Sequence, residues 1–257
     1  MNEKTINKIA WWIPIRKWRD NFRNKLTSNK RDFSLNSGER QVSVNMDGIR
    51  KDHVLRYNLA YSFIKDNLYD KNTIGADIFC GNGYGSYLVA SKLQNTTLLS
   101  IDASGEAIEL AKKHYSFEDK ITYQNKFFPF QLQKNRYDYI ISFESIEHIE
   151  NDIKFIETLI GAIKNKGYLF LSTPNEKVMS LKKNPNKFHY RHYTSKEITE
   201  IFKKYNLEII EEYGQNTYII DNNGLILGVL EETEMNLIKN YNGQFKVYIL
   251  KINRPDH

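Results

Sequence analysis

Residues 74–85 read IGADIFCGNGYG, and a second apolar segment further along the chain ends in Ile101-Asp102. The first stretch has the pattern of a buried strand that runs into a glycine turn, after which a helix and a second strand are expected. Gly81 and Gly83 permit the positive φ angles and the close backbone approach that a Cβ would obstruct. The helix after the turn presents free N–H groups to a ligand, and Asp102 lies where a carboxylate accepts hydrogen bonds from ribose hydroxyls. The pattern therefore predicts a site for a ribose-containing cofactor.

The glycine spacing separates two classes of cofactor. Dinucleotide-binding turns read G-x-G-x-x-G, whereas this chain has G-x-G-x-G, with Asp77 four residues before Gly81. A carboxylate at this place disfavours a pyrophosphate and suits a ligand that carries an amine and a sulfonium. The motif resembles the first motif of the class I S-adenosylmethionine (SAM)-dependent methyltransferases. The resemblance implies SAM as the cofactor, and the residues it implies for SAM binding are Asp77, Gly81, Asn82, Gly83, Tyr84, Asp102, Ala103, Asn125 and Phe143.

Strands and helices alternate from about residue 73 onwards. The expected strands are 74–79, 97–101, 121–125, 137–143, 168–172, 207–213 and 244–252, and the expected helices are 49–68, 84–94, 104–115, 152–163 and 195–205. Such alternation implies parallel pairing with right-handed crossovers. We therefore expect an α/β fold with a Rossmann-like, doubly wound sheet of seven strands. The family resemblance implies the order 3-2-1-4-5-7-6, with the last strand antiparallel.

Composition divides the chain at about residue 45. Residues 1–45 are expected to form a basic, Trp-rich arm and linker, and residues 46–257 the methyltransferase domain. Within that domain, residues 214–244 separate the last two expected strands and form a longer connection than a hairpin requires. We expect this segment to be either a lid or an oligomer contact. Residues 1–31 hold nine Lys or Arg against two acidic residues, a net charge of +7, which leaves −1 for the rest. A nearly neutral body argues against nucleic acid as the partner.

The arm contains all three tryptophans, Trp11, Trp12 and Trp18. Its apolar run, residues 9–15, is too short to cross a bilayer. Indole rings beside basic residues suit a lipid–water interface, and packing on the domain or on a partner subunit is the alternative. The single Cys80 excludes an internal disulfide and is compatible with a reducing compartment. We expect a cytoplasmic protein, with peripheral contact to the inner membrane surface as one role for residues 1–31.

Chemically active side chains gather at the end of the fourth strand, in Glu144, Glu147 and His148. Ligands of open α/β sheets bind beyond the carboxyl ends of the strands, and the spacing predicts that one helical turn places all three on one face. In one interpretation, His148 is the general base for an acceptor hydroxyl and Glu147 orients its imidazole. In another, Glu144, Glu147, His148 and His189 bind a divalent metal, for which this ligand set suits Mn, Fe, Co, Ni or Zn. A structural role in shaping the pocket is the third.

Further motifs bear on the acceptor. The E-x-x-E-H run resembles that of ubiquinone-pathway O-methyltransferases and of small-RNA 2′-O-methyltransferases. Residues 37–40 (SGER) and 53–57 (HVLRY) resemble a bacterial subgroup associated with surface-polysaccharide biosynthesis. That resemblance implies O-methylation of a sugar, a nucleotide-linked sugar or a phosphorylated intermediate of capsule or lipopolysaccharide assembly. The alternatives are a quinone-type phenol, RNA ribose, and a non-catalytic SAM-binding subunit that supports a partner enzyme.

Basic side chains accompany these motifs. Arg56 or Tyr57 is a candidate for binding the methionine carboxylate or an anionic acceptor. The expected acceptor mouth also carries positive charge, from Lys182, Lys183, Lys187 and Arg191. These side chains suit a phosphate-bearing acceptor, and a solvated loop explains them equally well.

Overall fold

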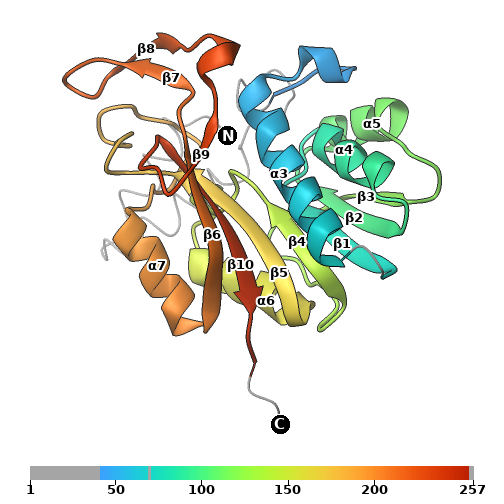
Figure 1. Ribbon diagram of the computed structural model, residues 1–257. Helices are drawn as coiled ribbons and strands as arrows, with labels where there is room; N and C mark the ends of the chain where they lie inside the picture. Colours follow the sequence, from blue (N-terminus) through green and yellow to red (C-terminus); the bar gives the residue numbers. More distant parts are fainter. Residues whose placement is uncertain (1–40, 69–70, 255–257) are drawn as a thin grey trace, which may run out of the picture.

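A mixed sheet with helices on both faces forms the centre of the molecule (Figure 1). The computed structural model describes residues 41–68 and 71–254, so the arm predicted for residues 1–40 lies outside the described residues. The strands of the main sheet are β1 (Thr73–Ile78), β2 (Thr96–Asp102), β3 (Ile121–Asn125), β4 (Tyr137–Ser142), β5 (Ile163–Pro174), β6 (Leu207–Gln215), β9 (Leu237–Lys239) and β10 (Phe245–Ile252). The helices are α3 (Lys51–Leu68), α4 (Tyr84–Lys92), α5 (Gly105–His114), α6 (Asp152–Ala162) and α7 (Ser195–Lys204).

The strand order is β3-β2-β1-β4-β5-β10-β6-β9. Strands β1 to β5 pair in parallel, and β10 is inserted antiparallel between β5 and β6. The predicted order of the seven expected strands, of which β10 is the last in the chain, is thereby confirmed. The prediction of seven strands in total is wrong, because β9 adds an eighth at the edge beside β6. A strand of three residues is too short for its side chains to show a periodic pattern.

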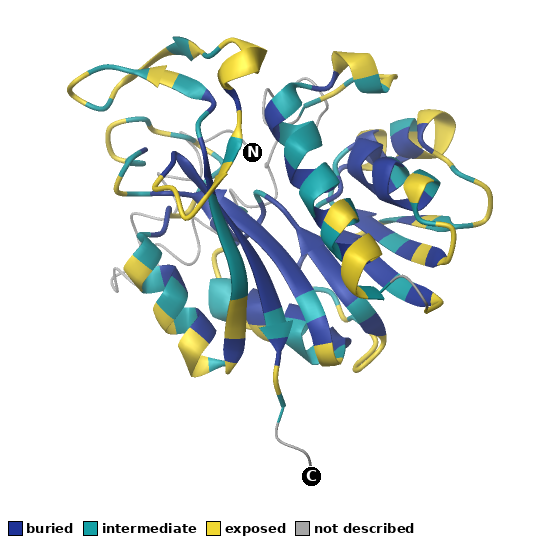
Figure 2. Ribbon diagram, viewed as in Figure 1, coloured by how far each residue is buried: buried dark blue, intermediate teal, exposed yellow. Residues whose placement is uncertain are grey.

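The helices cover the two faces of the sheet with separate apolar layers. Neighbouring residues of one strand point to opposite faces, so Tyr248 of β10 packs in the layer of α6 and α7, whereas Ile249 packs in that of α3 and α4. Figure 2 shows the central strands almost wholly buried and the outer helix faces exposed. All five predicted helices are present. The expected helix end and strand start at 163–168 are wrong, because β5 already begins at Ile163.

The segment between β6 and β10 has a structure of its own. The short strands β7 (Tyr218–Ile220) and β8 (Ile226–Val229) form a separate hairpin, followed by the 3₁₀ turn η5 (Glu232–Glu234) and by β9. The Asn184 side chain ties the hairpin turn to the loop after β5, because it donates to the Gly224 carbonyl at 2.8 Å and accepts from Ile226 N–H at 2.9 Å. A lid role or an oligomer contact for this segment stays a prediction. None of the helices within 41–68 and 71–254 is long and apolar enough to cross a membrane.

Candidate active site

The glycine turn between β1 and α4 has the backbone that its sequence requires. Gly81 and Gly83 have φ of 57° and 87°, and Gly83 caps α4 without any side-chain hydrogen bond. The third glycine has a packing role: a Cβ on Gly85 would lie 2.0 Å from the Tyr57 ring. These three positions therefore bring backbone N–H groups and a tyrosine ring close to a cleft.

Asp102 stands at the end of β2 and lines this cleft together with Ala103. One carboxylate oxygen accepts from Gly81 N–H at 3.0 Å, and the other accepts from Ser104 N–H at 2.8 Å. Backbone donors of the turn and of the α5 N-terminus thus hold the carboxylate at the place predicted for ribose binding.

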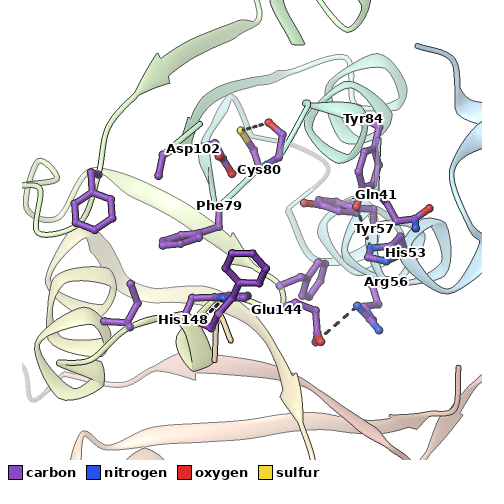
Figure 3. Close-up of a pocket in the computed structure, with 16 residues that line it drawn as sticks. Gln41, His53, Arg56, Tyr57, Phe79, Cys80, Tyr84, Asp102, Glu144 and His148 are labelled. Atoms are coloured by element: carbon purple, nitrogen blue, oxygen red, sulfur yellow. Dashed lines mark hydrogen bonds and ion pairs between the residues drawn. The ribbon is translucent and has the colours of Figure 1, made fainter. Parts of the chain in front are cut away.

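The cleft contains five of the nine residues predicted for cofactor binding (Figure 3). The five are Gly81, Tyr84, Asp102, Ala103 and Phe143, whereas Asp77, Asn82, Gly83 and Asn125 are not among its lining residues. Aromatic and polar side chains that were not predicted for the cofactor complete the wall: Gln41, His53, Phe79, Phe127 and Phe188. His53 belongs to the H-V-L-R-Y run, Phe79 lies within residues 74–85, and Phe188 precedes His189, but Gln41 and Phe127 have no signal in the sequence that marks them as site residues.

Asp77 lies beneath the turn and not at the cleft wall. It is fully buried, and it accepts hydrogen bonds from the Tyr57 hydroxyl at 3.1 and 3.2 Å and from Ser86 Oγ at 2.6 Å. Burial raises the pKa of the Asp77 carboxyl to about 7, against the lowering effect of these hydrogen bonds. This carboxylate therefore holds the turn and the α3–α4 contact together from below.

The two asparagines of the predicted set also have structural partners. Asn82 donates to the Ser43 carbonyl at 2.7 Å, which fastens the segment before α3 across the glycine turn. Gln41, at the start of that segment, consequently reaches the cleft. Asn125 donates to the Asp102 carbonyl at 3.0 Å, so its side chain supports β2.

Arg56 of α3 is a nearly fully buried cation beside the cleft. Its Nε donates to Gln215 Oε1 at 2.7 Å, and its terminal nitrogens lie 3.6 Å from Asp52 and 3.7 Å from Glu144. The guanidinium also faces the Phe245 ring, with 4.8 Å between its carbon and the ring centroid. A planar guanidinium in this position is suited to an anionic ligand group.

A second, larger cavity adjoins the first. Its volume is about 850 Å³, within the range of about 300–1,000 Å³ typical of small-molecule sites. Six residues line both cavities: Gln41, His53, Arg56, Glu144, His148 and Phe188. Leu225, Ile226 and Leu227 of the hairpin line the second one alone. Of the predicted basic residues, Lys183 and Lys187 line this second cavity. Arg191 instead pairs with Asp152 and Glu197.

Glu144 does not share a face with Glu147 and His148. It precedes the 3₁₀ turn η4 (Ile146–His148), and it has a positive φ of 46°. The carboxylate turns toward Ser172, whose hydroxyl donates to it at 2.6 Å, and toward Arg56 (Figure 3). Burial raises the pKa of Glu144, and the charge of Arg56 counteracts this. The expectation of one helical face is wrong, because the backbone enters the turn from the left-handed region at Glu144.

Glu147 and His148 instead converge with His189. Ligand atoms of these three residues lie within 4.8 Å of one another, and the rings of His148 and His189 meet edge to face at 4.7 Å. Tyr190 N–H donates to the Glu147 carbonyl at 2.7 Å, which holds the His189 loop against η4. The structure thus brings together three of the four predicted metal ligands and leaves out Glu144.

His192, which the sequence analysis assigned no role, lies behind this cluster. Its Nδ1 is 2.8 Å from the Met179 carbonyl oxygen, and its Nε2 is 2.7 Å from His189 Nδ1. Burial lowers the pKa of His192.

Comparisons with known proteins agree with this architecture. Residues 73–212 match the model of a methyltransferase domain family. A ubiquinone biosynthesis O-methyltransferase of Pelagibacter ubique is 29% identical over 185 residues, which cover 66% of this chain and 75% of that protein. A protein of the same name from Rickettsia felis is 38% identical over 104 residues, which cover 38% of this chain and 40% of that protein.

A solved structure has the same fold. Magnesium protoporphyrin IX methyltransferase from Synechocystis, with bound S-adenosylhomocysteine, superimposes with a TM-score of 0.56 at 17% identity. The match covers 83% of this chain and 90% of that one. The family model spans more than half of the sequence, and the glycine turn, Asp102 and the strand order of this chain agree with that family. This chain belongs to the class I SAM-dependent methyltransferases.

Proposed function

We propose that the protein transfers the SAM methyl group to a hydroxyl of a small aromatic acceptor, of the phenol class. The observation that carries this proposal is the junction of two cavities, at which Glu144 and His148 are among the six shared lining residues. The cavity beside the glycine turn suits the donor, and the larger cavity suits the acceptor. Phe188, Phe245 and Leu225 line part of the larger cavity and offer apolar contacts to a flat ring, while the charged and polar side chains beside them can bind its hydroxyl groups.

The names of the relatives favour the same acceptor class. Both curated relatives described above are O-methyltransferases of ubiquinone biosynthesis. No relative described above points to polysaccharide assembly, so the glycan acceptor expected from residues 37–40 and 53–57 is set aside in favour of its phenolic alternative.

Methyl transfer requires alignment and proton removal more than covalent chemistry by the protein, since the sulfonium is already activated. We assign the proton removal to His148. Its Nδ1 is 3.3 Å from the Phe188 carbonyl oxygen, which only accepts, so the ring donates there and keeps Nε2 as the basic atom. The acceptor O–H gives its proton to Nε2 while oxygen bonds to the methyl carbon, the carbon–sulfur bond breaks, and S-adenosylhomocysteine leaves.

Other residues align the donor. Asp102 is suited to the ribose hydroxyls, and Arg56 to the methionine carboxylate, because a buried fork of N–H donors binds a carboxylate well. Gln41 and Tyr84 close the cleft from the side of α3 and α4.

A metal is compatible with the same cluster. Glu147, His148 and His189 offer one carboxylate and two imidazoles within 4.8 Å, a donor set that suits Mn, Fe, Co, Ni or Zn. These three residues would hold such an ion, which would polarise the acceptor hydroxyl.

The test is product formation by the purified full chain with SAM. The acceptors are a dihydroxybenzoate, a nucleotide-linked sugar and a short RNA, and mass spectrometry detects the methylated product. We expect methylation of the phenol, and loss of about 10²–10⁴-fold in kcat for His148→Ala with SAM binding retained. Methylation of the sugar or the RNA alone would overturn the phenol assignment. Tight SAM binding without turnover, restored by a partner protein, would instead support the subunit alternative.

The metal has a separate assay. Protein treated with a chelator and then dialysed is measured for metal content and for turnover. Full activity without metal would eliminate a metal role, whereas reduced metal content of His189→Ala would support it.

A further inference from the structure

A chain of hydrogen bonds links two histidines between backbone groups at either end. Phe188 N–H donates to Asn186 Oδ1 at 2.9 Å, and Asn186 Nδ2 is 3.1 Å from His189 Nε2. His189 Nδ1 is 2.7 Å from His192 Nε2, and His192 Nδ1 is 2.8 Å from the Met179 carbonyl oxygen. Each ring therefore has a partner at both nitrogens.

The direction of each bond follows from the Asn186 end. A backbone N–H can only donate, so the Asn186 atom that faces Phe188 is the carbonyl oxygen and the one that faces His189 is the amide nitrogen. Since that nitrogen donates, His189 Nε2 carries a lone pair. A neutral imidazole has one N–H, so His189 has its proton on Nδ1 and donates it to His192 Nε2.

The Met179 end gives the same direction independently. A backbone carbonyl can only accept, so His192 has its proton on Nδ1. Its Nε2 is then the acceptor that His189 Nδ1–H requires. The two backbone anchors, one on each side of His189, agree on one arrangement of protons.

We propose that His192 is a positioning residue that holds His189 as the neutral tautomer protonated on Nδ1, with the ring fixed beside His148. This inference rests on the proposed function, for which it explains the shape of the reacting site. His148 has the same tautomer, because its Nδ1 donates to the Phe188 carbonyl. Neither Nε2 atom then carries a proton, and ligand atoms of the two histidines and of Glu147 lie within 4.8 Å of one another. With these tautomers, Nε2 of each ring and an ionised Glu147 carboxylate can only accept hydrogen bonds. Such a cluster binds a hydroxyl hydrogen or a cation, which would replace Asn186 as the partner of His189, and it disfavours an anion.

The first test needs no substrate. Long-range ¹H–¹⁵N spectra of the histidine rings are recorded on the full chain without SAM, and each signal is assigned by single-histidine variants. We expect His148, His189 and His192 to be protonated on Nδ1 and unprotonated on Nε2. A proton on Nε2 of His189 would overturn the proposal.

Variants reverse or break the chain. Asn186→Asp keeps an acceptor for Phe188 N–H but presents only oxygen to His189, so His189 should now carry a proton on Nε2. His192→Phe removes the acceptor, and we expect kcat to fall by about 10- to 100-fold, the effect typical of losing a residue that orients a functional histidine. His192→Gln supplies an amide oxygen and should restore part of the rate. The exposed His114, at the end of α5, gives the matched control His114→Gln, which should change neither tautomer nor rate.

The outcomes separate this inference from the proposed function. Failure to methylate a phenol would count against the proposed function, but it would not contradict the tautomers that we expect in the NMR spectra. Normal turnover with His189 protonated on Nε2 would defeat the inference alone. If His192→Phe does not fold, the wild-type spectrum and the spectrum of Asn186→Asp still test the tautomer that we propose for His189. An equal loss of rate in His192→Phe and His192→Gln, without a change in the His189 tautomer, would reduce His192 to a packing residue.

Discussion

The Tyr57 hydroxyl lies 3.1 and 3.2 Å from the two carboxylate oxygens of Asp77 and separates this buried acid from the donor cleft. The second carboxylate at the turn, Asp102, lines the cleft. Asp77, at the end of β1, thus supports the turn, and Asp102, at the end of β2, lines the cleft that we propose for the donor.

The burial of Asp77 predicts a pH-dependent effect on stability. Burial raises the pKa of the Asp77 carboxyl in the folded chain to about 7, from an ordinary value of 3.8. Between these values the folded state binds the proton and the unfolded state does not, so the contribution of Asp77 to the free energy of unfolding decreases as pH rises and is constant above about pH 7. Asp77→Asn lacks this dependence. Relative to wild type, the variant should gain about 2–3 kcal/mol between pH 5 and pH 8.

Urea unfolding of both proteins at pH 5 and at pH 8 measures this difference. The comparison cancels the fixed cost of replacing a carboxylate oxygen by an amide. A stability difference between the two proteins that is the same at both pH values would show that Asp77 is ionised in the folded chain across this range.

The third glycine of the turn gives a prediction with a matched control. A Cβ on Gly85 would meet the Tyr57 ring at 2.0 Å, whereas a Cβ on Gly161 in α6 would meet nothing within 4 Å. Gly85→Ala should therefore destabilise the protein by about 1–3 kcal/mol through overpacking. Gly161→Ala should stabilise it by up to about 1 kcal/mol, since alanine is the better helix former. Thermal unfolding compares the two, and the same sign of shift for both would contradict the close packing of Tyr57 on the turn.

Asp102 should decide donor affinity. Asp102→Ala removes the carboxylate that we assign to the ribose, and hydrogen bonds to a charged group contribute about 1.5–3 kcal/mol. Calorimetry should therefore show SAM binding weakened by about 10- to 100-fold. NAD titrated into the wild-type protein is the control for cofactor class and should give no heat of binding. Unchanged SAM affinity in the variant would remove Asp102 from the donor site.

The sequence predicted the elements whose pattern is local. The glycine turn and the strand that ends at Asp102 both follow from residues close together in the chain. The order of the sheet followed from the alternation of strands and helices, with the family resemblance supplying the place of the last strand. The short strand β9 was not predicted, because three residues are too few to show the alternation of apolar and polar side chains that identifies a strand.

The site could be predicted only in part, because its side chains come from distant segments. Glu147 and His189 come from two different segments, and only one of the three interpretations of the sequence, the metal site, brought them together. The exclusion of Glu144 depends on one backbone angle, which the E-x-x-E-H spacing does not reveal. The role of His192 depends on a hydrogen bond to the backbone carbonyl of Met179. Every residue has such a carbonyl, so the sequence does not indicate which one His192 contacts.

Arg56 and Arg50 offer a paired test of the donor carboxylate site. Both contact Asp52, but Arg56 lines both cavities, whereas Arg50 lines the larger cavity alone. Arg56→Gln should weaken SAM binding by about 10- to 100-fold, since a charge-assisted hydrogen bond is lost. Arg50→Gln should leave SAM affinity unchanged.

The two variants should also differ in stability. Arg56 is nearly fully buried, and its loss leaves Asp52 and Glu144 with less compensation, at a cost of about 3–5 kcal/mol. Arg50 is partly exposed, so its replacement should cost less. Calorimetry is therefore performed at a temperature at which urea unfolding shows both variants to be folded. Equal loss of SAM affinity in the two would mean that Asp52, and not a direct contact from Arg56, governs the donor cleft.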